Sequence, residues 1–209
     1  MSPLGPEGFA ALTGVSRETV ARLETYARLL KRWSGRINLV SRNTLGDLWQ
    51  RHFLDSAQLL PLIPEKTRSL VDLGSGAGFP GLVLAILGVP GVQLIESDKR
   101  KGIFLREAAR LTGTPVKIVD SRIEAAKPDP ADVVTARACA PLDKLLPLAQ
   151  RFIGPNTVCL FLKGEQAADE LTAARRDWKM AATQLSSRAD PRGVILKLEQ
   201  VTRESQGGG

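Results

Sequence analysis

Residues Leu70–Gly81 read LVDLGSGAGFPG, and this stretch decides the fold of the chain. Its first four residues form a short apolar run with one acid, Asp72, which is typical of a buried parallel strand. Three glycines follow at alternate positions, Gly74, Gly76 and Gly78, and the apolar pattern of a helix comes next. A strand, a glycine-rich turn and a helix in this order build the nucleotide crevice of an open α/β sheet.

The spacing of the glycines narrows the class of ligand. A dinucleotide-binding turn requires G-x-G-x-x-G, but Phe79 occupies the third glycine position. A P-loop requires Gly-Lys-Ser/Thr, and the turn contains no lysine. The remaining pattern, Asp-x-Gly-x-Gly-x-Gly, matches motif I of the S-adenosylmethionine-dependent methyltransferases. The alternative is an ordinary glycine-rich turn of an α/β protein.

Composition bounds the class of protein. At 209 residues the chain suits one α/β domain with an appendage. A net charge of +7 and a pI of about 9.8 favour a polyanionic partner, with RNA or DNA first and an anionic membrane second, against the alternative of a merely soluble basic protein.

The cysteines and the hydropathy indicate the compartment. Cys139 and Cys159 lie in apolar runs without a C-x-x-C pair, which is typical of reduced core residues in a cytosolic protein. The chain has a single histidine, so we expect no metal site. No apolar run approaches the ~18 residues of a membrane span, and the amino end lacks a signal core, so we expect a cytoplasmic protein.

The order of apolar segments predicts a doubly wound, mostly parallel, seven-stranded sheet of the Rossmann-like class I methyltransferase type with an N-terminal helical cap. We expect a flexible N-terminus over 1–15, the cap over 16–66, the S-adenosylmethionine-binding domain over 67–202 and a flexible tail over 203–209. The further strands are expected at 92–96, 116–119, 132–136, 158–162, 180–185 and 194–201. The helices are expected at 16–33, 44–60, 82–87, 99–111, 142–152 and 165–178, with Ile103, Phe104 and Ala108 facing the core.

Several side chains are predicted to meet at the carboxyl edge of this sheet. Glu96 ends the second strand about 20 residues after the glycine turn, where an acid commonly bonds ribose hydroxyls; the alternative is a solvated acid at a strand end. In the loop after the third strand, Ile123 can cover an adenine and Glu124 can accept from its amino group. Arg137 ends the fourth strand, where it can hold a methionine carboxylate or a substrate oxygen.

Basic residues are concentrated close to this edge. Lys99, Arg100 and Lys101 open a helix and predict a phosphate-binding face; the alternative is a solvated charged face. His52 either faces the ligand or is a helix residue bonded to a neighbour. Asp55 is spaced to accept from Arg51 at i, i+4.

The chain resembles the RsmG (GidB) family of bacterial methyltransferases, which act on a guanine N7 of small-subunit (16S) ribosomal RNA. The resemblance is carried by Trp33…Asn38-Leu39, Arg51-His52-Phe53-Leu54-Asp55-Ser56, the glycine turn with Phe79-Pro80-Gly81, Arg122-Ile123-Glu124, Thr135-Ala136-Arg137-Ala138 and Leu162-Lys163-Gly164. This sequence departs from the family where Glu96 replaces the usual Asp and where Cys139 stands at a position that often holds Phe. The amino- and carboxyl-terminal segments match weakly.

The resemblance implies S-adenosylmethionine as methyl donor and 16S ribosomal RNA or the small ribosomal subunit as partner. Chain length and the absence of an evident large apolar patch predict a monomer, and composition and hydropathy predict neither metal nor membrane. With the motif residues, the resemblance predicts a cofactor site of Asp72, Gly74, Gly76, Gly78, Phe79, Glu96, Ile123, Glu124 and Arg137. The expected RNA-binding residues are Arg51, His52, Lys99, Arg100, Lys101, Arg122 and Lys163.

Guanine N7 carries a free lone pair and no proton at neutral pH, so the expected in-line displacement needs no general base. Arg137, Lys163, Arg122 and His52 are therefore expected to position the reactants. Because the major groove of A-form RNA excludes side chains, we expect the target base in a loop or an irregular region. A methyltransferase of another substrate and a non-catalytic RNA-binding module remain as alternatives.

Overall fold

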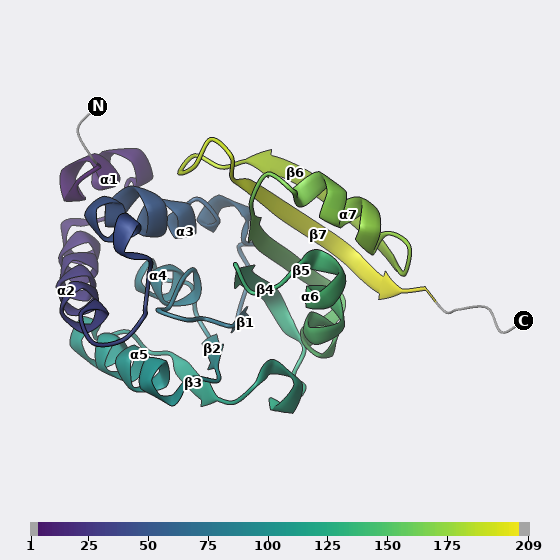
Figure 1. Cartoon of the computed structure of the whole chain (residues 1–209), viewed down its shortest axis with the longest axis horizontal. Coiled ribbons are helices and arrows are strands. Elements are labelled where there is room, and N and C mark those ends of the chain that lie inside the picture. Colours follow the sequence, from purple (N-terminus) through teal and green to yellow (C-terminus); the bar gives the residue numbers. More distant parts are fainter. Residues whose placement is uncertain (1–3, 205–209) are drawn as a thin grey trace, which may run out of the picture.

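The computed structural model of the chain describes residues 4–204, and it contains the predicted mixed seven-stranded sheet (Figure 1). The strand order is β3-β2-β1-β4-β5-β7-β6. Strands β1 to β5 run parallel, whereas β7 pairs antiparallel with both β5 and β6. Their bounds are β1 Leu70–Leu73, β2 Val92–Glu96, β3 Lys117–Asp120, β4 Ala131–Arg137, β5 Ile153–Lys163, β6 Trp178–Ser186 and β7 Val194–Arg203.

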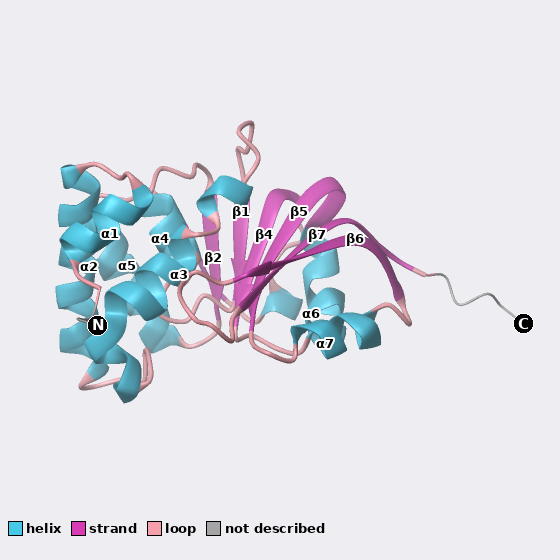
Figure 2. Ribbon diagram, turned by 90° about the horizontal axis from the view of Figure 1, so that it is seen from above, coloured by secondary structure: helices cyan, strands magenta, loops and turns pink. Residues whose placement is uncertain are grey.

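Helices cover both faces of the sheet (Figure 2). α4 (Gly81–Ile86) and α5 (Lys99–Thr112) pack with the cap on one face, and α6 (Leu142–Ala149) and α7 (Ala167–Ala174) pack on the other. Alternate residues of each central strand supply one of two apolar clusters: Val133 belongs to the first and Val134 to the second. Burial on both faces explains why these strands read as continuous apolar runs.

The cap begins with two helices, α1 (Pro6–Thr13) and α2 (Arg17–Ser34). The prediction of a flexible leader over 1–15 is wrong for α1, because its Phe9 is fully buried with its ring centroid 5.3 Å from that of Trp49. The proline and glycine of this segment mark the two ends of α1: Pro6 is its first residue, and Gly14 ends it with φ 70°. Residues 1–3, and residues 205–209 of the expected tail, lie outside the described part of the chain.

The single helix predicted over 44–60 is divided into four short pieces. A 3-10 helix, η1 (Arg42–Asp47), precedes a π-helix, η2 (Trp49–Leu54), which continues into α3 (Asp55–Ala57) and a second 3-10 turn, η3 (Leu60–Leu62). His52, Phe53 and Leu54 are buried consecutively, which the single apolar face of a surface helix does not allow. The segment is enclosed on more than one side, and π-turns often mark functional sites.

Smaller differences have local causes. The helix expected to reach residue 178 ends at Ala174, because Trp178 is buried as the first residue of β6. Phe104 and Ala108 are buried as predicted, but Ile103 is exposed on the outer side of α5. Two further 3-10 turns complete the chain, η4 (Ile123–Ala125) and η5 (Gln150–Phe152). None of the helices within residues 4–204 is long and apolar enough to cross a membrane.

Candidate active site

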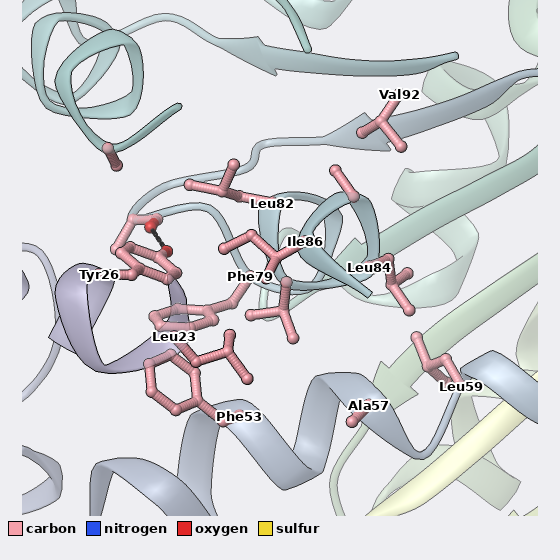
Figure 3. Packing of buried hydrophobic residues seen from close by; sticks show 14 of the residues in the cluster. Leu23, Tyr26, Phe53, Ala57, Leu59, Phe79, Leu82, Leu84, Ile86 and Val92 are labelled. Carbon is pink, nitrogen blue, oxygen red and sulfur yellow. Dashed lines mark hydrogen bonds between the residues drawn. The ribbon is translucent and has the colours of Figure 1, made fainter. Parts of the chain in front are cut away.

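The glycine turn joins β1 to α4 in a left-handed backbone conformation. Gly74, Gly76 and Gly78 have φ values of 64°, 57° and 98°, which side chains rarely adopt. A Cβ on Gly78 would lie 2.7 Å from the Tyr26 hydroxyl oxygen, so this glycine is also required by packing. The hydroxyl donates to the Ala77 carbonyl, which ties the turn to α2 of the cap (Figure 3).

Asp72 supports the turn from inside the protein. Its carboxylate is fully buried and accepts hydrogen bonds from Thr135 Oγ1 at 2.7 Å and from the Gly81 N–H at 3.3 Å. Burial raises the pKa of Asp72 to about 6, although these hydrogen bonds act to lower it. We expected Asp72 in the cofactor site. Its side chain instead holds the glycine turn and has no exposed surface for a ligand.

Glu96 lies beside the turn at the carboxyl end of β2. Its Oε2 accepts from the Gly76 N–H at 2.8 Å, and its Oε1 accepts from the Asp98 N–H at 2.7 Å. A carboxylate has about four acceptor positions, so two of them are left for the hydroxyls of a ribose. The fixed carboxylate and the glycine backbone fit the nucleoside half of S-adenosylmethionine.

Ile123 and Glu124 follow β3 at the same edge of the sheet. Ile123 belongs to the apolar cluster of Leu73 and Ile95, and Arg151 donates to the carbonyls of both Ile123 and Glu124. The charges of Glu96 and Glu124 both contribute to raising the pKa of Cys139, after the larger effect of its burial. Glu96 and Glu124, the two acids expected at the nucleoside site, are therefore both near enough to Cys139 for their charges to affect its thiol.

Phe79, also assigned to the cofactor site, is buried between the glycine turn and the cap. Its ring stacks on Tyr26 at a centroid distance of 5.6 Å and on His52 at 4.8 Å. The Arg137 guanidinium carbon lies 4.7 Å from the centre of the same ring. Phe79, whose presence rules out the G-x-G-x-x-G pattern, thus packs in the core, and its ring has almost no surface for a ligand.

Arg137 connects the end of β4 to the π-helix. It donates to the Arg51 carbonyl at 3.2 Å, to Asp55 Oδ2 at 3.3 Å and to His52 Nδ1 at 2.9 Å. The expected Arg51–Asp55 pair is wrong, because Arg51 instead bridges Asp190 at 2.7 Å. Arg137 takes the place of Arg51 beside Asp55, so a tertiary contact replaces the local one.

His52 is held as a neutral ring. A guanidinium can only donate, so Nδ1 accepts from Arg137 and we assign the proton to Nε2, which donates to Thr44 Oγ1 at 2.9 Å. Burial, followed by the charges of Arg137 and Arg51, lowers the pKa of His52 to about 3. Both ring nitrogens are bonded to neighbouring residues, which confirms the alternative of a bonded histidine, and His52 also lines the cleft described next.

A cleft of about 740 Å³ opens beside these residues, within the size range of small-molecule sites. Its walls come from the cap, from the ends of β4 and β5 and from the hairpin between β6 and β7. The lining includes Thr44, Arg51, His52, Asp55, Arg137, Ala138, Cys139, Ala140, Lys163, Glu170, Ser187 and Asp190. The glycine turn meets the cleft at Cys139, whose Sγ lies 3.0 Å from the position of a Cβ on Gly74.

The hairpin wall is the part of the site that sequence reasoning missed. Gln58 donates to Ser187 Oγ at 3.0 Å and accepts from the Arg188 N–H at 2.7 Å, and these contacts bridge about 130 positions of the chain. The two strands were expected at 180–185 and 194–201, but no local signal indicated that the hairpin between them would dock on the cap.

The structure separates the predicted basic residues into two groups. Arg51, His52 and Lys163 line the cleft, where Lys163 donates to the Ala140 carbonyl at 2.5 Å and pairs with Glu170 at 2.8 Å. The other group lies on the surface after β2 and β3, and consists of Lys99, Arg100, Lys101 and Arg122, of which only Lys101 is half-buried.

The fold and the sequence both match known proteins. The crystal structure of ribosomal protein L11 methylase from Lactobacillus delbrueckii subsp. bulgaricus is 17% identical, with a TM-score of 0.58 over 72% of this chain and 77% of that chain. M. jannaschii TYW2 in complex with AdoMet is also 17% identical, with a TM-score of 0.58 over 81% of this chain and 80% of that chain. These likenesses show the shared fold.

Sequence relatives cover nearly the whole chain. Ribosomal RNA small subunit methyltransferase G of Rhodospirillum centenum is 60% identical over 92% of this chain and 89% of the relative. The protein of the same name from Paramagnetospirillum magneticum is 56% identical over 96% and 98%. The family model described as rRNA small subunit methyltransferase G matches residues 19–191. The chain therefore belongs to the rRNA small subunit methyltransferase G (GidB) family.

Proposed function

We propose that this protein transfers a methyl group from S-adenosylmethionine to N7 of a guanine in 16S ribosomal RNA. Membership of the rRNA small subunit methyltransferase G family, across residues 19–191, is the observation that carries the proposal. Two features support it: Glu96 is fixed with free acceptor positions beside the glycine turn, and a cleft of about 740 Å³, large enough to admit a base, adjoins that turn at Cys139.

The donor would lie against the glycine turn, with Glu96 on its ribose and with Ile123 and Glu124 beside its adenine. When bound, S-adenosylmethionine supplies an electrophilic methyl group on a sulfonium centre. Because the rings of Phe79 and Tyr26 fill the space behind the turn, this part of the site is formed before any ligand enters.

The chain's own residues align the reactants and move no proton. N7 of guanine attacks with its lone pair, and the S–CH₃ bond breaks as the N–CH₃ bond forms. His52 cannot act as a base, because Arg137 occupies its only lone pair. Orientation of this kind can remove about 7–11 kcal/mol of a barrier. His52, Arg137 and Lys163 would position the guanine through the cleft walls.

The cleft selects a base that has left its helix. Side chains do not reach N7 in a regular RNA stem, so the guanine would come from a loop or be swung out at a cost of a few kcal/mol. Lys99, Arg100, Lys101 and Arg122 would then contact phosphates on either side of it. We expect a monomer acting in the cytoplasm, where its ribosomal substrate is found.

A direct test maps the transferred methyl group. Small ribosomal subunits from a strain lacking the enzyme are incubated with the purified protein and tritiated S-adenosylmethionine. The 16S RNA is then reduced with borohydride and cleaved with aniline, which breaks the strand at N7-methylguanine. We expect one new cleavage site in the 16S RNA. Label without cleavage would establish a different target atom, and label on another molecule would support the alternative of another substrate.

Donor binding tests the remaining alternative. Calorimetry with S-adenosylmethionine should give saturable binding that Glu96→Ala weakens at least tenfold, because both ribose hydroxyls lose their acceptor. A wild-type protein that binds no donor would support a non-catalytic RNA-binding module. Arg137→Met should change the donor Kd less than threefold, because Arg137 is bonded to the cap; a tenfold loss would place it at the methionine carboxylate.

A further inference from the structure

The loop between β4 and α6, residues 138–141, is where the glycine turn and the cleft meet. Ala138 holds φ 48°, a left-handed value that a side chain rarely adopts, and the next residue places its sulfur against Gly74. All four loop residues line the cleft. Any shift of this loop therefore moves the boundary between the donor and the substrate base.

One ion pair braces this loop from below. Lys163, the last residue of β5, donates to the Ala140 carbonyl at 2.5 Å and to Glu170 Oε2 at 2.8 Å. The same oxygen of Glu170 accepts from the Leu142 N–H at 2.8 Å. The pair thus holds the backbone on both sides of Pro141, whose own carbonyl accepts from the Lys144 and Leu145 N–H groups of α6.

The burial of Lys163 separates it from the exposed cations. Its side chain is only 8% exposed and its charge is balanced by Glu170, whereas Lys99 and Arg100 are open to solvent. A phosphate contact by Lys163 would require this pair to break and would leave Glu170 without its partner, which is costly for a group withdrawn from water. The geometry favours an internal role for the ammonium group.

We propose that Glu170 is a positioning residue for methyl transfer, which acts through Lys163 and the Leu142 N–H to fix the β4–α6 loop against the glycine turn. This inference rests on the proposed function, because its main readout is the rate of methyl transfer. A misplacement of about 1 Å can lower a rate about 100-fold, so the effect should fall on kcat more than on KM.

The test compares Glu170→Gln with Asp169→Asn. Both substitutions remove one negative charge from the first turn of α7, but Asp169 is exposed and makes none of these contacts. We expect Glu170→Gln to lower kcat by 10- to 100-fold with less than a threefold change in the donor Kd, and Asp169→Asn to leave both unchanged. A wild-type kcat for Glu170→Gln would overturn the inference.

A double-mutant cycle distinguishes positioning from a direct RNA contact. If Glu170 acts through Lys163, Lys163→Met and Glu170→Gln should be non-additive in kcat, and Lys163→Met should leave the salt dependence of RNA binding unchanged. A smaller salt slope for Lys163→Met would place the ammonium on a phosphate and overturn the inference.

Amide hydrogen exchange distinguishes a displaced loop from a general loss of fold. The Leu142 amide should exchange its hydrogen faster in Glu170→Ala, while the amides of β4 keep their protection; unchanged exchange at Leu142 would contradict the brace. The failure of the proposed function is recognised separately, since the wild-type protein would then transfer no methyl to 16S RNA in any of these assays.

Discussion

At the scale of single residues, the site depends on ionisable groups withdrawn from water. His52 stacks on the Phe79 ring and Asp72 holds the glycine turn through the Gly81 N–H, and burial shifts the pKa of each so as to favour its neutral form. The pKa of His52 falls from 6.5 to about 3, and that of Asp72 rises from 3.8 to about 6. Their contributions to the pH dependence of stability therefore have opposite signs.

Comparison of the wild type with a His52 variant at acid pH isolates the contribution of His52 to the free energy of unfolding. Between pH 6.5 and 3 the unfolded chain binds a proton on this histidine that the folded chain does not, so the free energy of unfolding falls as the pH falls. Below pH 6.5 the loss is up to about 1.4 kcal/mol per pH unit. We expect urea denaturation at pH 7, 6 and 5 to give a shallower acid loss for His52→Asn than for the wild type. Asp72 is common to both proteins and cancels; parallel profiles would contradict a neutral buried His52.

The glycines of the turn differ in the space around them. Gly78→Ala must place a methyl group 2.7 Å from the Tyr26 hydroxyl and 2.9 Å from Leu82 Cβ while holding φ 98°, so we expect a loss of about 2–5 kcal/mol. Gly76→Ala has only backbone strain to bear, because its nearest neighbour would lie 3.8 Å away, and it should lose about 1–2 kcal/mol. Thermal and urea unfolding measure both variants. Equal losses would show that packing against Tyr26 contributes nothing.

At the scale of elements, the cap and the β6–β7 hairpin form one wall of the cleft. Gln58 is buried and bonds both the hairpin and Asp55, whereas the Arg51–Asp190 bridge is 36% and 24% exposed. A buried amide with five hydrogen bonds, to Asp55, Ser187 and Arg188, contributes more than a solvated ion pair.

Two alanine variants test this order. Gln58→Ala should lose about 1–3 kcal/mol, because it leaves buried backbone and side-chain groups without partners. Arg51→Ala should lose less than about 1 kcal/mol. Hydrogen exchange at residues 187–190 should quicken markedly in Gln58→Ala alone. The reverse ranking would mean that charge, and not the buried amide, holds the hairpin on the cap.

The elements that could be predicted from the sequence are those set by local pattern. The strand, glycine turn and helix at Leu70–Gly81, and the acid that ends β2, follow from spacing over about 30 residues. The division of the 44–60 segment could not be predicted, because His52 and Gln58 find their partners in Arg137 and the hairpin. The leader was misread for a related reason: the burial of Phe9 depends on Trp49.

At the scale of the whole molecule, the excess of 29 basic over 22 acidic residues gives a net charge of +7. For RNA binding, we expect the positions of the basic residues relative to the cleft to matter more than the net charge. Lys99 and Arg100 open α5 at the carboxyl edge of the sheet, whereas Arg203 ends β7; Figure 1 places α5 and the end of β7 on opposite sides of the molecule.

The salt dependence of RNA binding tests this placement. If Lys99 and Arg100 each contact a phosphate, the double variant Lys99→Gln/Arg100→Gln should reduce the slope of log K against log salt by about 1.5, at 0.7–0.9 per contact. The control, Arg203→Gln, should leave the slope unchanged. Titration of 16S RNA fragments at several salt concentrations measures both. An equal reduction in all variants would indicate diffuse attraction without a defined phosphate track.

The aromatic column of Tyr26, Phe79 and His52 runs from the cap through the glycine turn to the edge of the cleft. Movement of the cap away from the glycine turn would have to separate these stacked rings. If the RNA proposed above binds in the cleft, we therefore expect the nucleic acid to rearrange more than the cap does.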